Sequence, residues 1–136
     1  MALGVISTGF GTTIVFGTSA FSANIYNITR SAVARKAIDR THMGSALSRM
    51  EFLPATLVDD GTYELELDFN PNVSVPIDGV AETITITYPI GTQLTAAKDV
   101  FTGFVTSVGQ RVPLDDRLSQ TVTLKISGKV VRTIAT

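Results

Sequence analysis

The sequence predicts a single, mainly β domain. Three segments alternate between apolar and polar residues, as strands do when they bury one face: residues 62–69, 82–88 and 121–127. β-Branched and aromatic residues recur along most of the chain, whereas only residues 44–53 space their apolar side chains for a turn or two of helix. With 136 residues and 44% apolar content, the chain is long enough for one core and too short for two.

The first 61 residues are predicted to contain two strand regions and one loop. A β-branched and aromatic run at residues 13–16 lies between two glycines and forms the first strand of an N-terminal region that covers residues 1–21. Residues 22–43 contain isoleucines and a valine without a helical stripe, which indicates a strand interrupted near residues 30–32. Residues 44–61 are expected to form a loop or a short helix, which Pro54 would end.

Turn residues separate the elements of the second half. The turn sequence DDG precedes the strand at residues 62–69, and NPN ends it. The segment up to residue 81 contains Pro76 and is expected to be irregular. A strand at 82–88 and a polar connector at 92–99 lead to a hairpin, in which VFTGFVTSVG and LSQTVTLKIS flank QRVPLDDR. Residues 128–136 are expected to form an extended tail, either frayed or docked on a neighbour.

Two of the alternating strands have a polar face of distinctive composition. Three carboxylates share one face of residues 62–69, and three threonines share one face of residues 82–88. Carboxylates in a row repel one another unless water or cations surround them. An ordinary solvent-exposed face accounts for this pattern, and so does a surface kept negative so that a passing polyanion does not adhere. The residues of the two faces are Glu64, Glu66, Asp68, Thr83, Thr85 and Thr87.

The formal net charge of −1 conceals a segregation of charge along the chain. Residues 1–50 contain five bases and one acid, residues 51–82 contain eight acids and no base, and the remainder contains six bases and three acids. Blocks of opposite sign indicate surfaces that meet, either within a subunit or between copies of it. Scattered solvated charges account equally well for any single residue.

No motif in the sequence predicts an enzyme. Because the chain has one histidine and no cysteine, a zinc site would need His42 with carboxylates alone. Asp39, His42 and Ser45 are too close in sequence to be expected in the geometry of a catalytic triad. No phosphate-binding loop or nucleophile elbow is present. We therefore expect no catalytic residue, no metal site and no cofactor.

Nucleic-acid binding and membrane insertion are also disfavoured. Bases do not cluster with aromatic residues, and only Arg35, Lys36 and Arg40 could form a small basic patch. Gly, Ser and Thr interrupt the apolar residues of MALGVISTGFGTTIVFG, and no basic leader precedes them. We therefore expect neither a signal peptide nor a membrane-spanning helix.

Two blocks of the sequence resemble the major tail tube proteins of lambda-like long-tailed bacteriophages. In ETITITYPIG and VFTGFVTSVGQRVPLDDRLSQTVTLKISG, a strand ending in an aromatic, Pro and Gly precedes an aromatic-Gly-aromatic strand, a Ser-x-Gly turn and a Thr/Val strand. In EFLPATLVDDGTYELELDFNPN, a Pro-containing loop leads to a Gly turn and a strand ending in Asn-Pro. The order of these motifs over about residues 43–128 carries the resemblance. The helix usual in the family after Asn-Pro is not expected from NPNVSVPIDGVAE, so either it is lost or residues 44–53 supply the helical packing.

The resemblance implies a two-sheet β-sandwich or barrel-like subunit with at most one short helix and long interface loops. Copies of the chain would stack as hexameric rings into the hollow tube of a phage tail. Other partners would be tape measure, terminator and distal tail proteins, and DNA would pass through without specific binding. The protein would be assembled in the host cytoplasm and located in the tail of the virion.

Within such a tube, particular residues are expected to face the lumen or a neighbouring subunit. Either the carboxylate face of residues 62–69 or the threonine face of residues 82–88 would line the lumen. Residues 31–49 and 51–61 would contact other subunits. The charged candidates for these contacts are Arg35, Lys36, Arg40, Arg49, Glu51, Asp59 and Asp60.

Two alternative functions fit the same pattern less well. A related ring-forming injection component, such as a tail terminator or a secretion-system tube protein, would share the sheet arrangement. A terminator would form single closed rings rather than open-ended stacks. A carbohydrate- or ligand-binding β-sandwich would be a monomer with an aromatic-lined groove, whereas Tyr63 and Tyr88 fall on predicted core faces.

Overall fold

The computed structural model describes residues 11–44, 48–89 and 95–134, and within them the chain forms eight β-strands and no α-helix. The mainly β prediction is therefore confirmed. The strands are β1 (Thr13–Phe16), β2 (Ile25–Arg30), β3 (Ala34–Asp39), β4 (Phe52–Asp59), β5 (Thr62–Asp68), β6 (Glu82–Thr87), β7 (Lys98–Arg111) and β8 (Ser119–Thr133).

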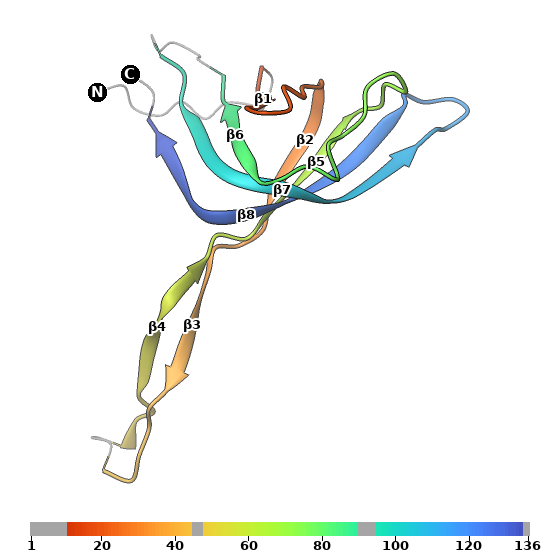
Figure 1. Cartoon of the computed structure of the whole chain (residues 1–136). Coiled ribbons are helices and arrows are strands. Elements are labelled where there is room, and N and C mark those ends of the chain that lie inside the picture. Colours follow the sequence, from red (N-terminus) through yellow and green to blue (C-terminus); the bar gives the residue numbers. More distant parts are fainter. Residues whose placement is uncertain (1–10, 45–47, 90–94, 135–136) are drawn as a thin grey trace.

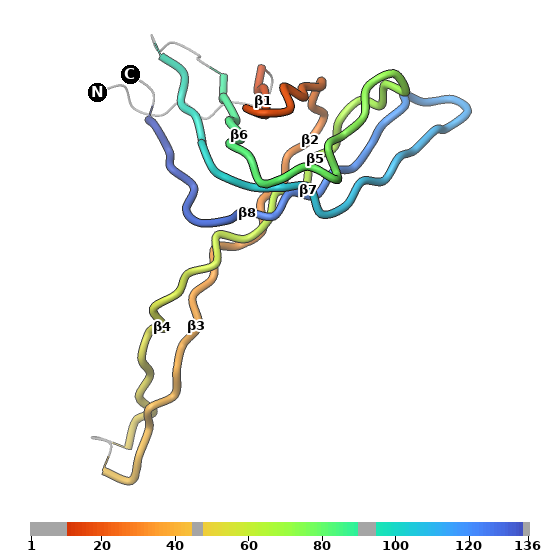
Figure 2. The backbone as a smooth tube through the Cα atoms, in the orientation of Figure 1, coloured from red at the N-terminus to blue at the C-terminus, as the bar shows by residue number. Residues whose placement is uncertain are grey.

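The strands form two antiparallel sheets of unequal size. Six strands make a curled sheet in the order β1-β6-β7-β8-β5-β2, and β3 and β4 make a separate two-stranded ribbon. Figure 1 shows this ribbon, called the arm from here on, extending away from the curled sheet. The backbone trace shows that β2 continues into β3, and β4 into β5, along the same direction (Figure 2). The arm is thus an extension of the β2–β5 pair beyond the core.

The curl of the large sheet arises in its two longest strands, β7 and β8. Their register shifts between Val100 and Thr102 and again between Val105 and Ser107. Opposite the first shift, Gly128 has φ +87°, a conformation that a residue without a Cβ adopts at little cost. Because extra residues in one strand bend it and increase its twist, β7 and β8 curve back on themselves (Figure 1).

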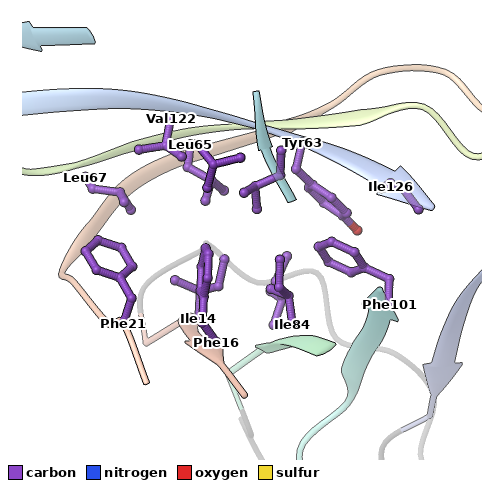
Figure 3. Packing of buried hydrophobic residues seen from close by; sticks show 13 residues of the cluster. Ile14, Phe16, Phe21, Tyr63, Leu65, Leu67, Ile84, Phe101, Val122 and Ile126 are labelled. Carbon is purple, nitrogen blue, oxygen red and sulfur yellow. The ribbon is translucent and has the colours of Figure 1, made fainter. Parts of the chain in front are cut away.

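The core lies inside the curl, between the β5–β8 half of the sheet and the β1–β6 half. Figure 3 shows Leu65, Leu67 and Val122 on one side of the core and Ile14, Phe16 and Ile84 on the other. The Tyr63 and Phe101 rings stack at one end with centroids 5.0 Å apart. These two facing layers make the body barrel-like, as expected. The buried apolar residues are Ile14, Phe16, Phe21, Tyr63, Leu65, Leu67, Ile84, Ile86, Phe101, Val105, Val122, Leu124 and Ile126.

The local sequence patterns correspond closely to the observed strands. The first strand, the break between β2 and β3, the two alternating strands and the β7–β8 hairpin occur where they were expected. Residues 70–81 form turns and irregular structure, so the family's helix does not occur there. Residues 1–10 of the expected N-terminal region and residues 45–47 of the expected short helix lie outside the described residues.

Two segments differ from expectation. Residues 52–59, expected as part of a loop or short helix, form strand β4, and Pro54 lies within it. Pro54 is tolerated because β4 pairs only with β3 and its other edge carries no ladder among the described residues. Residues 128–133, expected as an extended tail that is frayed or docked on a neighbour, are extended but form the end of β8, where Val131, Arg132 and Thr133 pair with the start of β7 of the same chain.

Candidate functional site

The arm exposes nearly all of its side chains. Every residue of β3 is exposed, and β4 has only one residue of intermediate burial. Several of the exposed side chains are large and apolar. Leu57 is 83% exposed, and Phe52, Val58, Ile38 and Leu53 are each between 43% and 54% exposed. Because an isolated two-stranded ribbon is only marginally stable in water, this apolar surface calls for a covering partner.

Both faces of the arm carry apolar side chains. Ile38 and Leu53 are cross-strand partners and therefore point to the same side. Phe52 and Val58 lie one and five positions along the strand from Leu53, and so point to the opposite side. A ribbon lying on its own core would be apolar on one face only. The arm is therefore suited to being covered from two sides.

The charged candidates on the arm fall into two groups. The first group has partners within the chain: Arg40 Nε lies 3.8 Å from Glu51 Oε2, and Lys125 Nζ lies 2.9 Å from Asp59 Oδ1. Asp60 pairs with Arg30 at 3.6 Å. The second group, Arg35, Lys36 and Arg49, has no carboxylate partner among the described residues.

The lumen candidates all lie on the convex face of the curled sheet, which is defined here as the face turned away from the core. Strand alternation places Glu64, Glu66 and Asp68 opposite the buried side chains of β5. Thr83, Thr85 and Thr87 have the same relation to the buried residues of β6. The sequence offered the two sets as alternatives, and they remain so, because β5 and β6 lie on opposite halves of the curl and their outer faces turn in opposite directions (Figure 3).

The charge on the convex face is only partly neutralised. Arg117 Nη2 lies 3.4 Å from Glu66 Oε1, and Asp68 accepts hydrogen bonds from the backbone and side-chain amides of Asn24. Glu64 is exposed and has no cationic partner among the described residues. Lys125 lies on this face as well, but its charge is balanced by Asp59.

Asp99, a buried carboxylate that was not among the residues predicted from the sequence, lies inside the curl. Asp99 is fully buried, and its Oδ2 atom accepts hydrogen bonds from Tyr63 (3.2 Å), Tyr88 (2.6 Å) and Arg132 Nη2 (3.0 Å). Its Oδ1 atom accepts a hydrogen bond from Arg132 Nε at 2.7 Å. These four residues are called the Asp99 cluster. They tie β5, β7, β8 and the residue after β6 together.

The Asp99 cluster shifts the ionisation of its members. Burial raises the pKa of Asp99, but hydrogen bonds from Arg132 and Tyr88 and the charge of Arg132 outweigh it and hold the pKa below its ordinary value of 3.8. Burial and the hydrogen bond with Asp99 raise the pKa of Tyr88 well above its ordinary value of 10.0. The cluster therefore favours one fixed set of protonation states at neutral pH.

The described residues hold no arrangement typical of catalysis. His42 Nε2 lies 3.7 Å from Glu51 Oε2, and its Nδ1 accepts a hydrogen bond from the Gly44 amide. Ser45, the third residue of the triad weighed above, lies outside the described residues. In the same part of the chain no cluster of three or more His, Asp or Glu side chains is placed to bind a metal. None of the described segments is a helix of the length and apolarity that crossing a membrane requires.

A polar cavity of about 380 Å³ lies beside the end of β5. Asn24, Asp68, Asn70 and Gln120 line it, and Phe21 is the one aromatic ring among its lining residues. Carbohydrate- and ligand-binding grooves are expected to present several aromatic or apolar surfaces. The cavity therefore gives little support to the ligand-binding alternative.

Comparison with known families gives one match that covers most of the chain. The profile of the family described as lambda phage tail tube protein, TTP, matches residues 18–133. No curated protein sequence matches the chain.

Several solved structures have a similar fold at low sequence identity. A chain in the structure of the PVC sheath/tube terminator, from an extracellular contractile injection system, superposes with a TM-score of 0.73 and 12% identity, covering 97% of this chain and 99% of that one. A chain of the virion of a native gene transfer agent particle superposes with a TM-score of 0.65 and 13% identity, covering 94% of this chain and 99% of that one. The SPP1 tail tube superposes with a TM-score of 0.54 and 9% identity, covering 89% of this chain and 74% of that one. At these identities the likenesses establish the fold alone.

Proposed function

The chain belongs to the lambda phage tail tube protein family, and we propose that its copies form hexameric rings that stack into the hollow tube of a phage tail. It is a structural component of the virion tail and not an enzyme. In this proposal the tube conducts the genome into the host, and the main partner of each subunit is another copy of the same chain.

The observation that carries the proposal is the uncovered arm. Its apolar residues are exposed on both faces, and its own chain offers nothing that covers them among the described residues. A second copy is the partner favoured by charge. Among the described residues, Arg35, Lys36 and Arg49 on the arm lack carboxylate partners, whereas Asp78 in the loop after β5 lacks a cationic one. We propose that these unpaired groups meet between subunits.

The other charged candidates have a different role in the proposal. Arg40 and Glu51 pair across the arm, and Asp59 and Asp60 bind the body of their own chain. We propose that they fix the shape of the contact surface and do not themselves reach a neighbour.

The edges of the curled sheet provide a second kind of contact. β1 and β2 are the terminal strands of the six-stranded sheet, and each has a strand partner on one side only among the described residues. An unpaired edge is a template for pairing with another chain. Side-by-side copies could therefore extend one sheet into the next around a closed ring.

The convex face has the composition required of a channel wall for DNA. Exposed carboxylates repel phosphate, and threonine hydroxyls offer water-like contacts without cationic groups that would hold the backbone. The polar faces of β5 and β6 turn outward from opposite halves of the curl, so one of them can line the lumen and not both. We propose that it is either the carboxylate face of Glu64, Glu66 and Asp68 or the threonine face of Thr83, Thr85 and Thr87. DNA would then pass with no specific binding.

A tube terminator is the second candidate, because a chain in the structure of the PVC sheath/tube terminator shares this fold with a TM-score of 0.73. In either role, tape measure, terminator and distal tail proteins would be neighbours. Negative-stain electron microscopy of the purified protein separates the possibilities. Open-ended stacks support a tube subunit and single closed rings support a terminator. A monomer at high concentration would contradict both.

A further inference from the structure

The arm joins the body through a compact set of hydrogen bonds, called the arm root, formed by Arg30, Ser31, Asp59, Asp60 and Gly61. The Ser31 amide donates to the Thr62 carbonyl at 2.9 Å, and the Thr62 amide donates to Ser31 Oγ at 2.7 Å. The two chain segments that lead into the arm are therefore clamped to each other where the large sheet ends.

Gly61 allows these two segments to approach closely. It has φ +88°, and a Cβ at this position would collide with Ser31 Oγ and lie 3.1 Å from the Ala32 carbonyl oxygen. Its amide donates to Asp59 Oδ1 at 2.8 Å. The turn between β4 and β5 is thus held in one conformation that a larger residue would disturb.

Strand β8 holds the arm root from a second direction, on both sides of its bend. Before the bend, Lys125 Nζ binds Asp59 at 2.9 Å and the Ile126 amide donates to the Gly61 carbonyl at 3.2 Å. After the bend, the Val130 amide donates to Asp60 Oδ2 at 2.7 Å. Two successive carboxylates therefore anchor the arm to two parts of β8.

Asp60 is the most enclosed charge of the arm root. Its side chain is 11% exposed, and it pairs with Arg30, whose guanidinium also lies 5.6 Å from the centre of the Tyr63 ring. Arg30 Nε is buried and has no hydrogen-bond partner among the described residues. An unsatisfied buried donor reduces stability, so maximal stability alone does not account for this arrangement. Buried polar groups of this kind can instead select one conformation over others.

We propose that Asp60 is a positioning residue that fixes the direction of the arm relative to the body before another copy binds. The inference rests on the proposed function, in which the arm contacts a second copy of the chain. A two-stranded ribbon attached only by two strands would swing, and ordering it during assembly would reduce the affinity between subunits. The arm root removes that loss, because the arm is already held in the direction in which it binds.

The first test measures the direction of the arm in the monomer. The natural chain contains no cysteine, so Lys36→Cys on the arm and Thr121→Cys on the convex face provide two unique sites for spin labels. Distances are measured by pulsed electron paramagnetic resonance below the assembly concentration. We expect a narrow distance distribution in the parent chain and a clearly broader one after Asp60→Ala. Asp115→Ala removes an exposed carboxylate from the β7–β8 turn and is the matched control.

The second test measures assembly of the unlabelled chains by sedimentation and electron microscopy. We expect Asp60→Ala to raise the critical concentration about tenfold, the factor that corresponds to 1.4 kcal/mol, and Asp115→Ala to leave it unchanged. Should Asp60→Ala fail to fold, Asp60→Asn decides the question, because its amide oxygen can still accept from Val130 while the pairing with Arg30 is weakened.

The outcomes separate this inference from the proposed function. A distance distribution as narrow as the parent's, or a broad one with unchanged critical concentration, overturns the role of Asp60. Failure of the parent chain itself to form rings or tubes contradicts the proposed function instead, and then the role of Asp60 in assembly fails with it.

Discussion

Replacing Asp99 by asparagine tests whether the Asp99 cluster closes the curled sheet. The carboxylate accepts four hydrogen bonds, of which two come from Arg132 and one each from Tyr63 and Tyr88. Asparagine offers one oxygen and one NH2 group. The NH2 group would therefore face a donor, either the guanidinium or the tyrosine hydroxyls, where the second carboxylate oxygen now accepts.

The expected loss of stability follows from these contacts. The Arg132 side chain is 60% exposed, so its guanidinium can hydrogen-bond to water instead, and most of the free energy of its two lost hydrogen bonds is recovered. The Tyr63 hydroxyl is buried and that of Tyr88 is partly buried, and they lose charge-assisted hydrogen bonds worth about 1.5–3 kcal/mol each, less for Tyr88. Allowing for the one oxygen that remains, we expect Asp99→Asn to lower the free energy of unfolding by about 2–4 kcal/mol.

The measurement is urea denaturation followed by far-UV circular dichroism, at a protein concentration where the chain is monomeric. The m-value should stay constant while the midpoint falls. Tyr88→Phe removes one hydroxyl and leaves the carboxylate with other donors, so a smaller loss of about 1 kcal/mol is expected. Asp115→Asn is the control with the same change of charge. A stability of Asp99→Asn within about 0.5 kcal/mol of the parent would refute the reasoning.

Three further predictions concern pH, the arm and the lumen. The folded state lowers the pKa of Asp99, so the stability that this carboxylate contributes is present above about pH 3.8 and is lost as the pH falls through the folded-state pKa. The folded state raises the pKa of Tyr88, so the stability that this hydroxyl contributes is present below pH 10.0 and is lost as the pH rises through the folded-state pKa. Unfolding titrations of the parent chain should show a fall in stability at each limit, and both falls should shrink in Asp99→Asn; equal falls in the two proteins would contradict this. Deleting residues 44–53 should abolish tubes but leave a folded monomer, since the arm tip lies outside the core; normal tubes by microscopy would contradict this. A bulky label on either Thr85→Cys or Glu64→Cys, but not on both, should appear as density inside the bore by cryo-electron microscopy, and density on the outer wall for both labels is the contrary result.

The sequence predicted the strands of the body because their information is local. Alternation with a period of two places Tyr63 and Leu65 inside and Glu64 outside, whatever the rest of the chain does. The position of the two polar faces on opposite halves of the curl was not predictable, because it depends on the order in which distant strands pair. β5 and β6 follow each other in the chain, yet β7 and β8 lie between them in the sheet.

Strand β4 of the arm and the buried carboxylate were missed for different physical reasons. β4 has exposed residues on both sides, so it lacks the alternation that identifies a strand, and Pro54 suggested an end to regular structure. Asp99 was assigned to a polar connector. The signal was present, because Asp99 is in step with the buried residues Phe101, Gly103 and Val105, and this indicates that its side chain faces the core. Gly128 suggested a strand end, whereas it is the point at which β8 bends.

The place of β8 in the sheet has a consequence for biosynthesis. β8 lies between β7 and β5, contributes Val122, Leu124 and Ile126 to the core, and holds the arm root. A nascent chain still lacking β8 has neither a closed core nor a fixed arm, so it cannot offer a neighbour the complete binding surface. Under the proposed function, a subunit would polymerise only after β8 is complete, so half-made subunits on neighbouring ribosomes would not link to one another.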